Sequence, residues 1–187
     1  MQRRELLQWI AAVTGQAFVG VDALFAAADT GADSPYSPAQ VAFFDDVADT
    51  IMPRTDSPGA RDAGVGPYIA RYSAACYPPE HISLLKTGLS DIAARMQKLS
   101  GQDFGRAEEQ QRVALLTEID QQAKEHAHAV DGKPGEHAPH YFTLMKQLTL
   151  IGYFTSELGA THLSRYRPIP GRYQGCVPYR GEAFWAW

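Results

Sequence analysis

The sequence predicts an all-α fold, with a single small helical domain of about five helices and a long irregular, aromatic C-terminal arm. Apolar residues recur at the spacing of helix faces in several long segments. Clusters of proline and glycine separate these segments, and signals for β-strands are nearly absent. At 187 residues, the chain is long enough for one domain with its own core.

The first helix of the domain is expected to begin at the motif SPAQ. Ser37 is a typical N-cap, Pro38 suits the first turn, and Gln40 completes a capping box. The apolar residues that follow at helical spacing are Val41, Phe44, Val47, Ala48 and Ile51. Pro53 ends this pattern, and residues 53–67, rich in Pro, Gly and Asp, are expected to form a loop.

Two more helices are expected in the following segment. A short helix runs from Tyr68 to Cys76, where Pro78 stops it, and a longer one begins at Pro79 and ends at Gly101. The apolar stripe of the longer helix consists of Ile82, Leu85, Leu89, Ile92, Met96 and Leu99.

The last two predicted helices flank a second loop at residues 131–139. The helix at about 107–128 is expected to face the core with Val113, Leu116 and Ile119. The helix from about Pro139 carries Phe142, Met145, Leu148, Leu150, Ile151 and Phe154. Because it is apolar on much of its circumference, it is predicted to be central in the fold, and Gly159 is expected to break or redirect it.

The C-terminal arm, residues 164–187, contains three prolines and three glycines, which argue against regular structure. Aromatic residues and arginines are interleaved along it, and Tyr, Trp and Arg dominate binding hot spots. We therefore expect an extended arm that lies on a partner, and the alternative is a tail that wraps the protein's own helices. The expected interface residues are Arg172, Tyr173, Cys176, Tyr179, Phe184, Trp185 and Trp187.

Residues 1–28 are interpreted as a twin-arginine signal segment, and 29–36 as a linker to the helical domain, 37–163. Two arginines and a spacer precede two apolar residues, and small residues lie near position 28. The residues that carry this signal are Arg3, Arg4, Leu6 and Leu7. This route exports folded proteins, so the protein is expected in the periplasm. The alternative is an amphipathic first helix of the mature domain.

Composition and motifs exclude several classes of function. The net charge of −4 gives no basic face for nucleic acid, and no run of about 20 apolar residues would span a membrane. No CxxC, P-loop, HExxH or GxSxG motif occurs, and no GxGxxG follows a strand. The chain is therefore expected to hold no catalytic residue, cofactor or metal of its own.

Two clusters of polar residues are candidate sites. His126, His128, His137 and His140 fall close together, but His126 and His128 point to different faces of a continued helix. Exposed histidines are favoured over a metal-dependent enzyme. The carboxylates Asp45, Asp46, Asp49 and Asp56 lack calcium-site spacing, which favours a solvated face or contact with basic residues of a partner.

Two blocks of sequence carry a resemblance to a known family. One is FFDDVADTIMPRTDSPGARDAGV, residues 43–65, and the other is LTLIGYFTSELGAT, residues 148–161, continuing to PIPGRYQGCVPY, residues 168–179. Together with the paired arginines at the start, these blocks resemble the gluconate 2-dehydrogenase subunit 3 family over roughly residues 37–180.

This resemblance implies a division of labour. The small, or gamma, subunit is non-catalytic, carries the twin-arginine signal for the translocation machinery, and supports maturation and co-export of a large flavoprotein. That flavoprotein, of the glucose-methanol-choline type, holds FAD and oxidises a sugar or sugar acid, as in gluconate 2-dehydrogenases, glucose dehydrogenases and glycoside 3-dehydrogenases. A cytochrome c subunit with haem often accepts the electrons. The alternative function is a free-standing periplasmic helical binding protein.

The two cysteines could form disulfides in the periplasm, because this compartment is oxidising. Cys176 is expected to be able to form a disulfide, either with a cysteine of the partner subunit or with Cys76. An intrachain bridge would close a long loop and contribute about 4–5 kcal/mol on the loop-entropy model. Free thiols are the third possibility.

Overall fold

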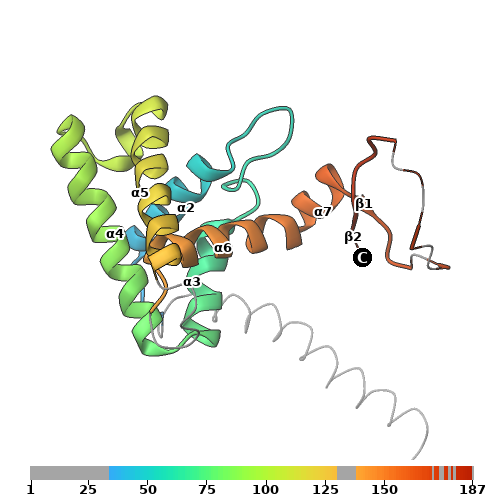
Figure 1. The fold of residues 1–187 in the computed structure, drawn as a ribbon, viewed down its shortest axis with the longest axis horizontal. Helices are drawn as coiled ribbons and strands as arrows, with labels where there is room; N and C mark the ends of the chain where they lie inside the picture. Colours follow the sequence, from blue (N-terminus) through green and yellow to red (C-terminus); the bar gives the residue numbers. More distant parts are fainter. Residues whose placement is uncertain are drawn as a thin grey trace, which may run out of the picture. The chain divides into compact units, whose positions relative to one another are not determined.

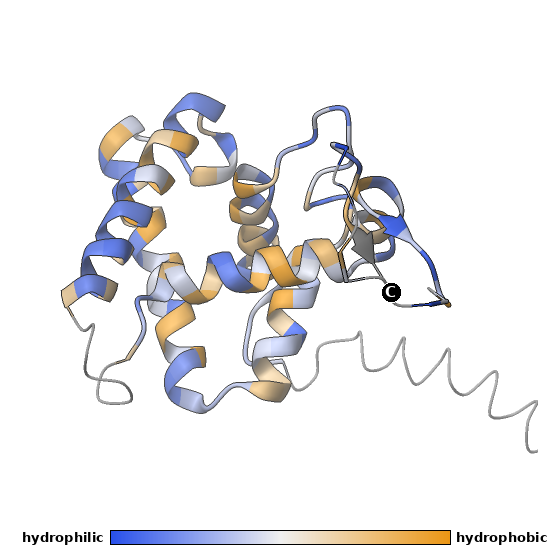
Figure 2. Cartoon of the chain, turned by 45° about the vertical axis from the view of Figure 1, so that its right-hand side comes forward, coloured by the Kyte–Doolittle hydropathy of each residue, from blue (hydrophilic) through white to orange (hydrophobic). Residues whose placement is uncertain are grey.

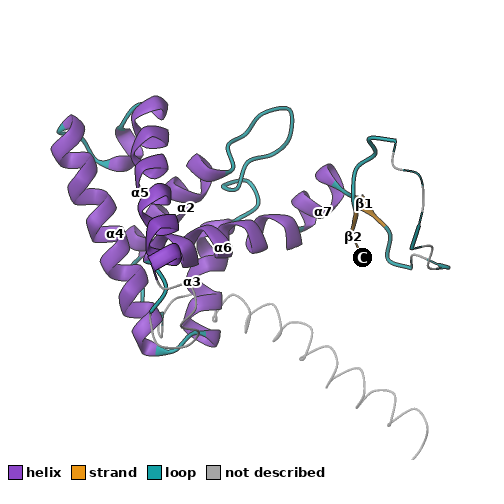
Figure 3. Ribbon diagram, viewed as in Figure 1, coloured by secondary structure: helices purple, strands orange, loops and turns teal. Residues whose placement is uncertain are grey.

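The computed structural model describes residues 34–129, 138–169 and 171–186, except for residues 173, 174, 177 and 179. The predicted all-α fold is confirmed, with six α-helices in the described residues (Figure 3). The elements are α2 (Pro38–Ile51), α3 (Val65–Cys76), α4 (Pro79–Ser100), η1 (Phe104–Arg106), α5 (Glu109–Ala129), α6 (Tyr141–Thr155), α7 (Glu157–Leu163), β1 (Arg165–Tyr166) and β2 (Trp185–Ala186). None of these helices is long and apolar enough to cross a membrane.

Helix α2 begins as the motif SPAQ predicts. The Ser37 hydroxyl accepts a hydrogen bond from the Gln40 backbone N–H, and the Gln40 side chain accepts one from the Ser37 N–H at 2.9 Å. This capping box satisfies two N–H groups that the first helical turn leaves without partners. The helix ends at Ile51, next to the predicted stop at Pro53.

Helix α3 begins at Val65, three residues before the predicted start at Tyr68. Gly64 precedes it with φ of 66°, a backbone conformation that glycine adopts without steric cost. Pro67 lies in the first turn, where its missing N–H is no loss. The N–H of Gly66 donates to the Asp45 carboxylate at 2.9 Å, so the start of α3 is tied to α2. The loop that follows α2 therefore ends at residue 64, not 67.

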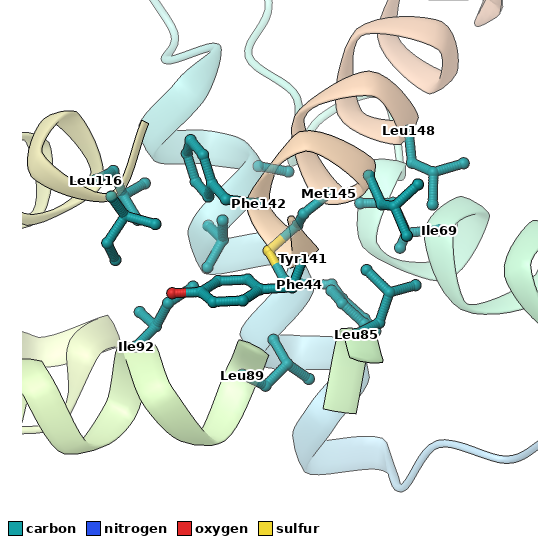
Figure 4. Close-up of a cluster of buried hydrophobic side chains, with 14 of the residues drawn as sticks. Phe44, Ile69, Leu85, Leu89, Ile92, Leu116, Tyr141, Phe142, Met145 and Leu148 are labelled. Carbon is teal, nitrogen blue, oxygen red and sulfur yellow. The ribbon is translucent and has the colours of Figure 1, made fainter. Parts of the chain in front are cut away.

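Helix α6 is central, as its apolar circumference predicts, and it packs against α2, α3, α4, α5 and α7 (Figure 1). Its buried apolar side chains meet those of the surrounding helices, as Figure 4 shows. The labelled residues are Phe44, Ile69, Leu85, Leu89, Ile92, Leu116, Tyr141, Phe142, Met145 and Leu148. Each fully buried side chain of this size contributes about 1.5–3 kcal/mol to folding.

Several residues expected in the core are exposed instead. The exposed fractions are 59% for Leu99, 44% for Val113, 47% for Ile151 and 38% for Phe154. Leu99 lies in the last turn of α4. In α5 the core positions are taken by Leu115, Leu116, Ile119 and Ala123, which rotates Val113 outward. Ile151 and Phe154 differ from these two residues because they are exposed although they lie on the central helix.

The break after α6 occurs at Ser156, three residues before the predicted break at Gly159. Ser156 has an extended backbone, and its hydroxyl accepts a hydrogen bond from the Gly159 N–H at 3.0 Å, so it is the N-cap of α7. Gly159 is buried against the backbone of Tyr153, where a β-carbon would clash. The glycine therefore permits close packing inside α7 and does not end a helix.

The C-terminal arm is irregular, as expected, but it is not extended from end to end. Strands β1 and β2 pair in parallel, with Arg165 opposite Trp185 and Tyr166 opposite Ala186. The arm therefore returns to its own start and forms a loop beyond α7 (Figure 1). The predicted loop at 131–139 and the signal segment lie outside the described residues, apart from residues 138 and 139.

Candidate functional site

The C-terminal end of α6 holds two irregular segments through two consecutive residues. The Tyr153 hydroxyl donates a hydrogen bond to the Pro58 carbonyl oxygen at 2.5 Å. The Phe154 ring packs edge-on against Phe184 of the arm, with ring centroids 5.9 Å apart. Neighbouring residues on a helix point about 100° apart, so one helix end can fix both the loop at residues 53–64 and the arm.

The loop at residues 53–64 is held by polar contacts. Asp62 pairs with Arg54 and accepts the Gly59 N–H at 2.8 Å, and both hydrogen bonds lower the pKa of its carboxyl group. The Ala60 N–H donates to the Met52 carbonyl oxygen at 2.9 Å. These bonds give a defined conformation to a loop whose residues 53–56 are exposed while Gly59 and Ala60 are buried.

The acidic cluster of α2 is paired within the chain. Arg61 of the loop contacts Asp46 at 2.5 Å and Asp49 at 3.8 Å, while Asp45 accepts the Gly66 N–H. The sequence did not predict these partners within the chain, which the next loop and the start of α3 bring back to α2. Contact with basic residues of a partner stays a prediction. Asp56 accepts a hydrogen bond from the neighbouring Thr55 hydroxyl.

Exposed apolar side chains concentrate at the α6 end and in the arm. Of the eight large hydrophobic side chains that are exposed among the described residues, five lie here: Ile151, Phe154, Tyr166, Ile169 and Phe184. We call these five residues the apolar end surface. Ile151 and Phe154 share a helix face because they are three residues apart. Figure 2 shows this end of α6 as apolar and the arm as mostly hydrophilic.

The structure places only part of the predicted interface. Arg172 and Cys176 are exposed, and Phe184 is half exposed against Phe154. The backbone of Trp185 lies in β2, while Tyr173, Tyr179 and Trp187 lie outside the described residues. Cys76 and Cys176 are both exposed and unbonded, so the structure does not contain the intrachain bridge.

A second polar cluster lies at the other end of α6. The rings of His126 and His140 are 6.0 Å apart, and the His140 ring lies 4.4 Å from that of Tyr141. The Tyr141 hydroxyl donates to Asp91 at 2.5 Å, and Asp91 also contacts Arg95 at 2.9 Å. This network links α4, α5 and α6.

The contacts of this cluster indicate a structural role. The His140 Nδ1 accepts the Phe142 backbone N–H at 3.2 Å and caps α6, so it is occupied. Burial, and then the neighbouring His126, lower the pKa of His140. Burial and the bond to Asp91 raise the pKa of Tyr141, which keeps its proton on the phenol. The described residues contain no group of three metal-ligating side chains, and His137 lies outside them.

Sequence reasoning missed Tyr153 and misplaced Ile151 and Phe154. The available signal was the composition of residues 141–155, which are apolar on much of the helix circumference. A helix that is apolar on much of its circumference is either completely buried or leaves an apolar face exposed.

The fold is therefore a small all-helical domain whose central helix ends at exposed apolar side chains, and α7 connects this end to an arginine-bearing arm. The sequence model of the family described as gluconate 2-dehydrogenase subunit 3 matches residues 38–171. The chain belongs to this family, which is a family of dehydrogenase subunits. No curated protein and no solved structure matches the chain significantly.

The family match begins at the first residue of α2 and ends inside the arm, at Gly171. It therefore includes the whole helical domain, the loop at residues 53–64 and strand β1. Residues 172–187, which contain all seven of the predicted interface residues, lie beyond the match.

Proposed function

We propose that this chain is the non-catalytic small subunit of an exported, FAD-dependent sugar or sugar-acid dehydrogenase. The observation that carries the proposal is the family match over the whole helical domain. In this proposal FAD belongs to a large flavoprotein subunit of the glucose-methanol-choline type, and a cytochrome c with haem is a third subunit. The chain contributes binding surface and stabilises the flavoprotein during maturation.

The apolar end surface supports a binding role. Ile169 is 82% exposed and Tyr166 53%, while Phe184 and Phe154 are 51% and 38% exposed although their rings touch. Burying such side chains in a complex removes apolar area from water at about 25 cal/mol per Å². An obligate interface of about 2,000 Å² or more needs a surface of this kind.

Export by the twin-arginine route is part of the same proposal. Arg3, Arg4, Leu6 and Leu7 would direct the folded complex to the periplasm, so that loss of both arginines leaves both subunits in the cytoplasm. The exposed thiol of Cys176 supports a disulfide to the partner subunit, formed after export. Non-reducing gels of the purified complex test this bond, because an unlinked large subunit excludes it.

The test of the proposed function is affinity purification of the full chain from its native host, followed by a visible absorption spectrum. We expect a co-purifying large chain with flavin bands, and c-type haem bands if the cytochrome is present. A lone, colourless, well-behaved monomer would overturn the proposal in favour of a free-standing binding protein. Bound metal in that monomer would instead favour the histidine cluster.

A further inference from the structure

The charge of the chain is divided unevenly between the helical domain and the arm. Residues 35–163 contain eleven Lys or Arg and sixteen Asp or Glu, a net charge of −5. Residues 164–187 contain four arginines and one glutamate, Glu182, a net charge of +3. The arm is therefore a basic segment on an acidic domain.

Most basic side chains of the domain that form ion pairs contact a carboxylate on another helix or loop. Arg95 contacts Asp91 and Glu118, Lys146 and Lys124 share Asp120, and Arg54 and Arg61 pair with the carboxylates described above. In the arm, Arg165 lies 3.7 Å from Glu182. Arg167, Arg172 and Arg180 are exposed and form no ion pair with any described residue.

The arm presents these arginines from a closed loop. The Arg165 N–H donates to the Phe184 carbonyl oxygen at 2.8 Å, which continues the pairing of β1 with β2. The contact between Phe184 and Phe154 fixes the base of the loop to α6. A loop that is closed before binding loses less conformational entropy when a partner orders it.

From these observations we infer that the arm docks on an acidic face of the flavoprotein subunit through Arg167, Arg172 and Arg180, together with the apolar end surface. This inference rests on the proposed function and adds the chemistry of the partner's surface. Along the arm, exposed arginines alternate in sequence with the exposed side chains of Tyr166, Ile169 and Phe184, which is the composition of a protein interface. Because the domain itself is acidic, the arm is the part that an acidic partner attracts.

The arrangement favours a protein partner over an anionic membrane. Two members of the apolar end surface, Ile151 and Phe154, belong to the rigid face of α6, so the surface extends beyond the arm. Helices that lie on a membrane carry several Lys or Arg on their polar face. Helix α6 has Lys146 alone, and that side chain pairs with Asp120.

The test compares two double charge reversals in the full chain, co-expressed with its flavoprotein and captured by affinity tag. One is R167E/R172E in the arm, and the other is the matched control K98E/R106E, at exposed positions of α4 and η1. Both change the net charge equally. Retained flavoprotein is measured by flavin absorbance as NaCl rises from about 0.05 to about 0.5 M, because salt screens exposed charges.

We expect R167E/R172E to lower the retained flavoprotein about tenfold and to remove the salt dependence, whereas K98E/R106E stays within about twofold of the unmodified chain. R167K/R172K, which keeps the charge, should restore most of the binding. Equal effects of the two reversals, or no effect of either, would overturn the inference and leave the proposed function standing. An unmodified chain that captures no flavoprotein would overturn both.

A second assay distinguishes docking on the flavoprotein from binding to an anionic membrane. The purified complex is mixed with vesicles that contain phosphatidylglycerol, and bound protein is measured after flotation. Binding that R167E/R172E abolishes, with flavoprotein capture unchanged, would assign the arm to a membrane and overturn the inference. Absence of vesicle binding, together with lost capture, supports it.

Discussion

The hydroxyl of Tyr153 and the carbonyl oxygen of Pro58 form a hydrogen bond between residues 95 positions apart in the chain. Tyr153 is only 2% exposed, so its ring is part of the core while its hydroxyl reaches the loop at residues 53–64. The next residue, Phe154, leaves the core and contacts the arm. The end of α6 thus couples core packing to the two segments that border the proposed interface.

Replacement of Tyr153 by Phe should remove this bond and leave the Pro58 carbonyl without its partner. We expect the free energy of unfolding to fall by about 1–2 kcal/mol and the amides of residues 53–64 to exchange faster. Urea unfolding and hydrogen exchange measure both effects. The control is Y166F, at a side chain that is 53% exposed, where a change within about 0.5 kcal/mol is expected. Unchanged exchange in Y153F would show that the bond does not hold the loop.

Gly88 tests how tightly α4 and α6 pack. A β-carbon at this buried position would meet the ring and the β-carbon of Tyr141 at 2.4–3.0 Å. Alanine improves helix propensity by about 1 kcal/mol, but overpacking costs about 1–3 kcal/mol. Because the β-carbon of Tyr141 is tied to its backbone and cannot turn away, the cost of overpacking should exceed the gain in helix propensity.

We therefore expect G88A to be net destabilising, by up to about 2 kcal/mol, and to weaken the bond from Tyr141 to Asp91. Equilibrium unfolding in urea gives the first quantity. The control is A93G at an exposed position of the same helix, which should cost about 1 kcal/mol through propensity alone. A stabilised G88A would contradict the packing described at this crossing.

His140 predicts a pH dependence of stability. Its folded pKa lies below the ordinary value of 6.5, because burial and His126 disfavour the charged ring. Arg95 also lowers this pKa, while Asp91 opposes the shift. The unfolded chain therefore binds a proton that the folded chain does not as pH falls through 6.5, and stability falls with it. A protonated Nδ1 would also lose its role as acceptor for the Phe142 N–H.

The measurement is urea unfolding of the unmodified chain and of H140S at about pH 7.5 and about pH 5.5. Serine keeps an N-cap acceptor, so H140S should lose less stability than the unmodified chain as pH falls. H162S, at an exposed histidine of α7, is the control and should keep the original dependence. Identical dependence in H140S and the unmodified chain would rule out His140 as the origin.

Local chemistry made much of the fold predictable. The capping box of Ser37 and Gln40 and the terminating glycine of α4 at Gly101 act within one turn, so they are visible in the sequence. The start of α3 was missed because glycine and proline, taken as loop residues, also suit a helix entry. The break at Ser156 was missed because its N-cap role depends on where α6 ends.

Contacts between distant segments account for the rest. The pairing of Arg61 with Asp46 depends on how the loop returns to α2, and no periodicity predicts it. The exposure of Ile151 depends on which side of α6 the other helices leave uncovered. The arm's composition predicted its irregularity, but not the pairing of β1 with β2 that closes it into a loop. Its binding role stays a prediction.

The most direct test of the proposed interface compares two substitutions of matched chemistry. Ile151 of α6 is 47% exposed and Val113 of α5 is 44% exposed, and both are β-branched residues on helix surfaces. I151D and V113D each place a charge on an exposed apolar position, so neither should prevent folding. The measured quantity is the flavoprotein that co-purifies with each tagged variant in co-expressing cells. We expect I151D to lose most of it, since a desolvated charge at the interface is costly, and V113D to retain it. Full retention by I151D, or equal loss in both variants, would contradict an interface at the end of α6.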